Sequence, residues 1–462
     1  MSLQISRLFF CNAIRRFYEF QKQTGRNANP SFTVHDGCSL NAVFTRTVNN
    51  IVDSIFVARL SETALTAASL VYSIQFLMIA VGVGTAVGLN ALLSRKIGEH
   101  KPEEACRAAT TGLFLMIFTS LIFSIIGIFL SDTIATKLAA DSELQELCKQ
   151  YLSINLVYCW GIFLQTYAQR LLQAVGDTVL SMLSLIIGAV LNIILDPIMI
   201  FGLLGCPAME VRGAAIATVI GQTAGAIAAL LFNRFRNPII HVRLKNYHFM
   251  WQDVADIYRV GLPTIIMQAI GSIMTFVVNR ILLDVSATAV AFFGIYYKLQ
   301  NFLMMPINGL GQAAIPIVGY NYGDKNYQRV QQTWKILLPT GVIITLCGTV
   351  IFWCFPGQLL QLFSASSEML TLGVPALRII SISFVMSAIT ILCGYFSSGL
   401  GNGIINMVGA AIRQLILLVP CLWIFIKISG ISHGWYAFWI AEIIAYIYSY
   451  CMSHRLLKTI SQ

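Results

Sequence analysis

Long apolar segments separated by short polar connections run through most of the chain. A helix needs about 20 apolar residues to cross a bilayer. Eleven windows meet that requirement, at 66–93, 108–131, 151–172, 178–204, 213–233, 260–283, 287–318, 336–355, 372–399, 403–428 and 434–452. The pattern predicts an all-α polytopic membrane protein.

A twelfth span is expected before the first of these windows, in an atypical segment. The motif 50-NIVDSIFVARL-60 is typical of the second half of a helix, but residues 15–46 are too polar to face lipid. Either the start or the reading frame is altered upstream of about residue 48, or a cytoplasmic leader precedes a short, weakly hydrophobic first span. In both cases we expect residues 1–30 to lack packed contacts.

A sparse glycine and polar pattern recurs at a constant offset of 225 residues, close to half of the 462-residue chain. An even number of spans in each half makes the repeats parallel, related by an axis along the membrane normal. We therefore expect about twelve transmembrane helices in two pseudo-symmetric six-helix lobes, the first helix being atypical. The offset relates Gly84 to Gly309, Gly98 to Gly323, Gly176 to Gly401, Met182 to Met407, Glu99 to Asp324 and Asp177 to Asn402.

Composition agrees with membrane spans and excludes other classes. Hydrophobic residues make up 57% of the chain and charged residues 11%, whereas soluble domains are about a quarter charged. The formal charge of +10 is typical of basic cytoplasmic loops, so we expect no nucleic-acid partner. The eleven cysteines include no CxxC motif and are expected in the core. No phosphate-binding GxxxxGK[ST] loop occurs.

Basic residues alternate between connections, which predicts that both termini are cytoplasmic. The expected organisation is an atypical N-terminal segment and an N-terminal lobe, a cytoplasmic connection between the lobes, a C-terminal lobe and a cytoplasmic tail. These cover residues 1–47, 48–233, 234–259, 260–455 and 456–462.

Ionisable groups inside a membrane are costly, so each is a functional candidate. Asp53 and Asp196 are the central aspartates of the first half, and Asn192 lies four residues before Asp196, on the same helix face. Pro197 leaves the carbonyl of Ile193 without its helical donor. The carboxylate, the amide oxygen and the freed carbonyl oxygen are the kind of ligands that a hard cation prefers. They equally suit a proton carrier, because burial favours the neutral form of a carboxyl group.

A structural role for Asp196 is the alternative, because Asp-Pro often marks a turn and the carboxylate could cap a kinked helix. The repeat argues for function. The second half has no polar counterpart of these residues: the positions equivalent to Asp53, Asn192 and Asp196 are Val278, Leu417 and Cys421. A kink needed by both halves would be expected twice, whereas an ion site is needed once.

Secondary candidates lie in the second half. Glu442 is near the middle of the last span and is either paired with another helix or a second titrating site. Lys298 and Arg413, also in apolar stretches, are candidates for pairing with carboxylates.

With these residues the chain resembles the multidrug and toxic compound extrusion (MATE) family, and most of all its bacterial DinF-like branch. The resemblance covers about residues 48–455. It rests on 50-NIVDSIFVARL-60, 169-QRLLQAVGDT-178, 192-NIILDPIMIFG-202, 213-GAAIATVIGQ-222 and 309-GLGQAAIPIVGYNYGDKN-326.

The resemblance implies a secondary active antiporter in the bacterial plasma membrane, and neither an enzyme nor a cofactor-dependent protein. It would work as a monomer among membrane lipid, exporting amphipathic organic compounds such as drugs and toxins against entering Na⁺ or H⁺. It also implies a cation site at Asp53, Asn192, Asp196 and Thr218. Na⁺ would bind at the two aspartates.

The chain departs from the family pattern at residues 30–46, which lack the usual apolar half-helix with a proline, and near Gly271, where another branch has a glutamate. The main alternative function is a flippase for lipid or polysaccharide precursors on a related fold. A flippase of this kind would be favoured by a wide, basic central cavity, and the few basic residues in the central apolar stretches argue against it. A prenyl-type transferase would need a DDxxD motif, and a major-facilitator transporter a DRxGRR-like loop; the chain has neither.

Overall fold

The computed structural model describes residue 56 and residues 60–138, 141–237, 239–242, 247–363 and 366–461. All secondary structure in this part of the chain is helical. Eight described helices are long and apolar enough to cross a membrane, or nine if Ser367–Ser381 and Phe384–Gly399, bent by 48° at their junction, form one span. The expectation of an all-α polytopic protein is confirmed. Two of the apolar windows are each divided between two helices: 151–172 between Ser142–Val157 and Trp160–Ala174, and 372–399 between Ser367–Ser381 and Phe384–Gly399.

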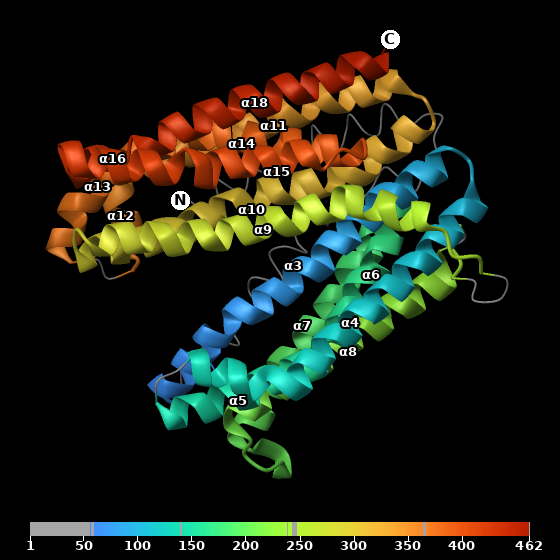
Figure 1. The fold of residues 1–462 in the computed structure, drawn as a ribbon, viewed down its shortest axis with the longest axis horizontal. Helices are drawn as coiled ribbons and strands as arrows, with labels where there is room; N and C mark the ends of the chain where they lie inside the picture. Colours follow the sequence, from blue (N-terminus) through green and yellow to red (C-terminus); the bar gives the residue numbers. More distant parts are fainter. Residues whose placement is uncertain are drawn as a thin grey trace. The chain divides into compact units, whose positions relative to one another are not determined.

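The described residues from 56 to 261 belong to one compact unit, called here the N unit. Within it α7 packs along α8, α6 also packs on α8, and α3 and α4 pack on each other and on α5 and α6. Figure 1 draws this bundle in blue to green. Its helices are α3 (Glu62–Gly98), α4 (Pro102–Leu138), α5 (Ser142–Val157), α6 (Trp160–Ala174), α7 (Thr178–Phe201) and α8 (Glu210–Arg236), with a 3-10 turn η3 (Leu203–Gly205) after α7.

Residues 262–462 belong to the second unit, called here the C unit. It starts inside α9 and contains a π-helical segment, η4, between α15 and α16. Its elements are α9 (Trp251–Leu283), α10 (Ala287–Gly323), α11 (Tyr327–Cys354), α12 (Pro356–Gln361), α13 (Ser367–Ser381), α14 (Phe384–Gly399), α15 (Ile404–Ala411), η4 (Ile412–Ile416), α16 (Leu418–Ser429), α17 (Ile431–Gly434) and α18 (Ala437–Ser461).

The offset of 225 residues is confirmed in the helix bounds. Adding it to 62–98 gives 287–323, the bounds of α10. Each helix is preceded by a capping serine whose hydroxyl accepts a hydrogen bond from the backbone N–H three residues later, over 2.9 Å at Ser61 and 3.1 Å at Ser286. The left-handed turn at Gly176 (φ 87°) recurs at Gly401 (φ 83°). The duplicated sequence therefore forms duplicated local structure.

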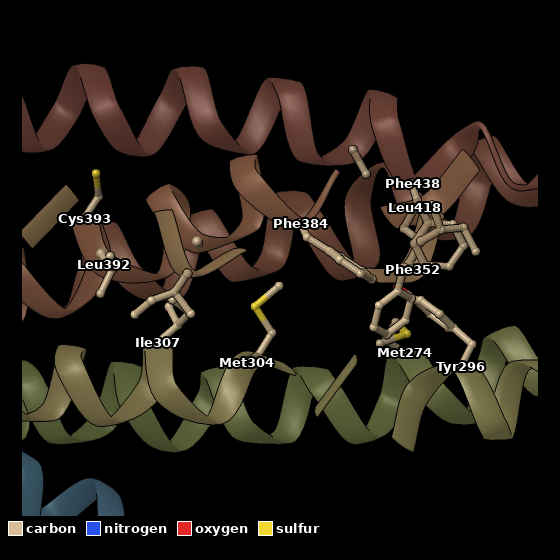
Figure 2. Packing of buried hydrophobic residues seen from close by; sticks show 14 of the residues in the cluster. Met274, Tyr296, Met304, Ile307, Phe352, Phe384, Leu392, Cys393, Leu418 and Phe438 are labelled. Atoms are coloured by element: carbon tan, nitrogen blue, oxygen red, sulfur yellow. The ribbon is translucent and has the colours of Figure 1, made fainter. Parts of the chain in front are cut away.

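Aromatic side chains fill the core of the C unit (Figure 2). Phe352 of α11 meets Phe384 of α14 edge to face, with ring centroids 5.1 Å apart. Tyr296 of α10 meets Phe438 of α18 in the same way, at 5.5 Å. Such pairs are worth about 0.5–1.5 kcal/mol beyond their buried area. They hold α10, α11, α14 and α18 in a defined arrangement.

The first turns of α9 are fixed to the N unit by charge and close packing. Arg107 of α4 forms a two-point ion pair with the buried Asp253, with contacts of 2.8 and 3.3 Å. Arg95 of α3 pairs with Asp256 over 3.1 Å. The boundary between the units falls between Gly261 and Leu262, so the chain passes from one unit to the next within a helix.

Gly221 is predicted to be essential for the close approach of α7 and α8. A Cβ at this position would lie 2.7 Å from the carbonyl oxygen of Gly188 and 2.8 Å from Cβ of Asn192. Gly221→Ala should therefore lower the thermal unfolding midpoint of the purified protein, at a cost of about 1–3 kcal/mol. Gly294→Ala, where no atom lies within 4 Å, is the matched control and should be neutral. An equal midpoint in both variants would contradict the packing.

Candidate functional site

An amide and a carboxylate share one face of α7. Nδ2 of Asn192 donates a hydrogen bond to Oδ1 of Asp196 over 3.0 Å. Both side chains are buried, with 1% and 0% of their surface exposed. Pro197 follows inside the same helix and has no N–H to donate, so the carbonyl of Ile193 loses its usual helical partner.

The close packing of α7 on α8 determines which α8 residue lies level with this pair. A Cβ on Gly188 or on Gly221 would come within 2.7 Å of the other residue's carbonyl oxygen. Further along, a Cβ on Gly213 would lie 2.5 Å from the carbonyl oxygen of Met199. The two contacts run in opposite chain directions, so the helices are antiparallel. Thr218, between the two α8 glycines, is therefore level with the part of α7 that contains Asp196.

Two oxygen atoms of this group have no hydrogen-bond partner among the described residues. They are Oδ1 of Asn192 and Oγ1 of Thr218, both buried. Buried polar atoms nearly always have a partner, which is often a water molecule or an ion. A carboxylate, an amide oxygen and a hydroxyl together present the oxygen ligands that a hard cation prefers. The carboxylate alone also accepts a proton.

The structure does not place Asp196 at a helix end. α7 continues through Pro197 to Phe201 and ends at Gly202, which is in the left-handed conformation (φ 73°). Asp196 is therefore not a cap at a helix end, and the alternative in which its carboxylate accepts a hydrogen bond from the backbone at a kink stays a prediction. Its carboxylate is buried in the helix interior, where water is scarce.

Asp53 lies outside the described residues, so its convergence with Asp196 stays a prediction. The described part of the chain contains no group of three or more His, Cys, Asp or Glu side chains placed to hold a metal ion. The described set at this site thus contributes one carboxylate, from Asp196, and uncharged oxygens from Asn192 and Thr218.

The secondary candidates separate into two outcomes. Arg413 in η4 pairs with Glu442 of α18, with Nη1 3.4 Å from Oε1, so the expected pairing is confirmed for this arginine. Lys298 of α10 is exposed and forms no ion pair with a described carboxylate.

Tyr296 of α10 is a buried polar residue that no sequence pattern indicates. This side chain is fully buried, and its hydroxyl has no hydrogen-bond partner among the described residues. Its ring packs in the aromatic core shown in Figure 2. In the sequence it is one tyrosine among many core aromatics, so no pattern distinguishes it.

Comparison with known proteins agrees with this fold and its repeat. The profile of the MatE family matches the chain twice, at residues 39–198 and 263–424. The chain therefore belongs to the MatE family of membrane transporters, and it is not an enzyme.

Relatives with assigned roles are similar over most of their length. The multidrug export protein MepA of Staphylococcus haemolyticus is 25% identical over 401 residues, covering 86% of this chain and 87% of the relative. MepA of Staphylococcus aureus strain bovine RF122 is 24% identical over 422 residues, covering 90% and 92%.

Solved structures share the fold. An outward-facing multidrug resistance MATE family transporter has a TM-score of 0.87 at 23% identity, covering 94% of this chain and 96% of that one. A MOP superfamily transporter from Pyrococcus furiosus has a TM-score of 0.86, also at 23% identity, with the same coverage.

Thr218→Val tests whether the buried hydroxyl is unpartnered in ion-free buffer. Valine keeps the shape and removes a polar atom without a partner, so the thermal unfolding midpoint should stay unchanged or rise. Thr166→Val is the matched control, because that hydroxyl donates to the carbonyl of Ile162 over 2.7 Å; its loss should cost about 1 kcal/mol. A larger loss at Thr218 than at Thr166 would show that the Thr218 hydroxyl is already engaged.

Proposed function

We propose that this chain is a secondary active antiporter that exports amphipathic organic compounds, driven by Na⁺ or H⁺ entering through the N unit. The observation that carries the proposal is the buried oxygen set of Asn192, Asp196 and Thr218. It consists of a carboxylate hydrogen-bonded to an amide, together with two buried oxygens that lack a described partner. Buried ionisable groups in membrane proteins commonly mark ion or proton pathways.

The substrate class rests on the relatives. Both MepA proteins are multidrug export proteins, and at about a quarter identity over most of the chain they support drug efflux as the common activity. No ATP-binding loop is found in the sequence, so a transmembrane ion gradient is the energy source we infer.

Coupling would follow from the charge on Asp196. A carboxylate in a dry bundle is costly, and a bound Na⁺ or proton removes that cost. If Asp53 lies beside it, ion binding also removes the repulsion between two like charges. The conformation that holds the ion best is then favoured. Entry of one charge across 100 mV supplies about 2.3 kcal/mol, which shifts a two-state equilibrium about fifty-fold.

We also infer both termini on the cytoplasmic side of a bacterial plasma membrane, with the protein working as a monomer. Basic residues gather at the α3–α4 junction, at Lys96, Lys101 and Arg107, and at the equivalent α10–α11 junction, at Lys325 and Arg329. Cytoplasmic connections carry such an excess of basic residues.

Dye efflux from proteoliposomes tests the proposal, with a pH gradient and a Na⁺ gradient imposed in turn. Asp196→Asn and Asp53→Asn should each abolish gradient-driven efflux, because an amide neither binds a proton nor attracts Na⁺ strongly. Both variants should still purify as folded protein. Asp132→Asn is the matched control: this exposed carboxylate pairs with Lys149 over 2.8 Å and its loss should leave efflux unchanged.

Wild-type efflux rates in both aspartate variants would contradict ion coupling at this site. Transfer of labelled lipid between leaflets, without gradient-driven dye movement, would favour the flippase alternative.

A further inference from the structure

The C unit contains an ion pair that the N-unit site does not use. Arg413 and Glu442 come from η4 and α18, and their side chains are 16% and 7% exposed. They meet through one contact, 3.4 Å between Nη1 and Oε1. Nε of Arg413 is buried and has no hydrogen-bond partner among the described residues. The Nε–H of the guanidinium group is therefore available to donate a hydrogen bond to a ligand.

Arg413 and Glu442 lie on the two C-unit elements that correspond, through the repeat, to α7 and α8 of the N unit. Subtracting the offset of 225 from 413 and 442 gives Gly188 and Ala217, on α7 and α8. Gly188 is the residue that lets α7 touch α8. Where the first copy has closely packed glycines and an oxygen set, the second has an arginine and a glutamate.

The backbone around Arg413 is also specialised. Residues Ile412–Ile416 adopt a π-helix between α15 and α16, whereas α7 is one continuous helix. Single π-helical turns inside membrane or soluble helices are frequent at functional sites. A buried ion pair is often no more stable than apolar residues of similar size, so stability alone is a weak reason for this pair.

Further polar groups lie on the neighbouring helices. The hydroxyl of Tyr296 on α10 and Oε1 of Gln414 in η4 are buried without a partner among the described residues. Ser387 of α14 is fully buried; its hydroxyl donates to the carbonyl of Ser383 over 3.2 Å and lies near the Glu442 carboxylate. The described charged or titratable groups that face Glu442 are Arg413 and Tyr296.

The remaining helices packed on α18 contribute no further charge there. Neither α14 nor α15 contains Asp, Glu, Lys, Arg or His. The basic residues of α11 lie in its first three turns. Lys427 of α16 is near the end of its helix, over the Trp423 ring. The net charge at the site is therefore that of Arg413 and Glu442 together.

We propose that Arg413 binds an anionic group of an amphipathic organic molecule, and that Glu442 is the resident counter-ion whose protonation favours this binding. Arginine stays charged at all relevant pH values, and its planar fork matches a carboxylate or sulfonate in two-point geometry. With Glu442 ionised the site is neutral. When Glu442 takes a proton from solution the site carries one positive charge, which an anion then neutralises.

The proposal rests on the chain being a transporter but not on the N-unit site. It gives the protein a second ligand class, taken up together with one proton, in addition to the compounds whose export is driven through Asp196.

Two dyes with the same xanthene core provide the test. Sulforhodamine B is a net anion whose sulfonates stay ionised, and rhodamine B methyl ester is a cation. Binding of each to the purified chain is measured by fluorescence polarisation at about pH 5.5 and about pH 8. Wild-type protein should bind the anion about tenfold more tightly at the lower pH. The cation should not show this preference.

Three variants separate the roles. Glu442→Gln mimics the protonated side chain, so it should bind the anion tightly at both pH values. Arg413→Gln should lose the anion at both. The double variant R413Q/E442Q removes both charges together and avoids an unpaired buried charge, so it should remain folded by size-exclusion chromatography, keep cation binding and lose anion binding.

Anion binding that persists in the folded double variant would overturn the proposal, as would a pH dependence that persists in Glu442→Gln. Asp196→Asn distinguishes this site from the proposed export function, because it should leave anion binding unchanged even though gradient-driven efflux is lost.

Discussion

The scarcity of water between apolar helices is the constraint on which the rest of this structure depends. A polar atom buried there must find a partner in the protein or bring in a ligand. Asn192 and Asp196 partly satisfy each other, and Arg413 and Glu442 do so through a single contact. In both places buried polar atoms are left over. Among the buried residues of the described helices the charged ones are Arg170, Asp196, Asp253 and Glu442. Partnerless polar atoms beside such a buried charge therefore identify candidate sites.

The duplicated frame makes the difference between the two units informative. α3 and α10 share their caps and bounds, so the copies are locally alike where only folding is required. They diverge on the helix pairs α7–α8 and η4–α18. In the N unit, glycines allow α7 to pack closely on α8. In the C unit, the equivalent of α7 contains a π-helical segment with Arg413. We interpret this divergence as two sites of opposite charge preference on one duplicated scaffold.

Much of the frame was predictable because its signals can be read directly from the sequence. The apolar windows and the four-residue spacing of Asn192 and Asp196 are local patterns, and the 225-residue offset comes from matching the two halves of the chain. The position of Thr218, level with Asp196, depends on glycine contacts between α7 and α8. The Arg413–Glu442 contact joins residues 29 positions apart. Periodicity does not encode such distances. The apolar pattern also does not predict the π-helical segment, the division of window 151–172 into α5 and α6, or that of window 372–399 into α13 and α14.

Charge movement on ion binding tests the central claim most directly. Proteoliposomes adsorbed on a solid-supported membrane would be exposed to a rapid step in Na⁺ concentration and, separately, in pH. The account predicts a transient current in wild-type protein for one of the two ions, its loss in Asp196→Asn and its retention in Glu442→Gln. An undiminished current in folded Asp196→Asn would contradict the assignment of ion coupling to the N unit.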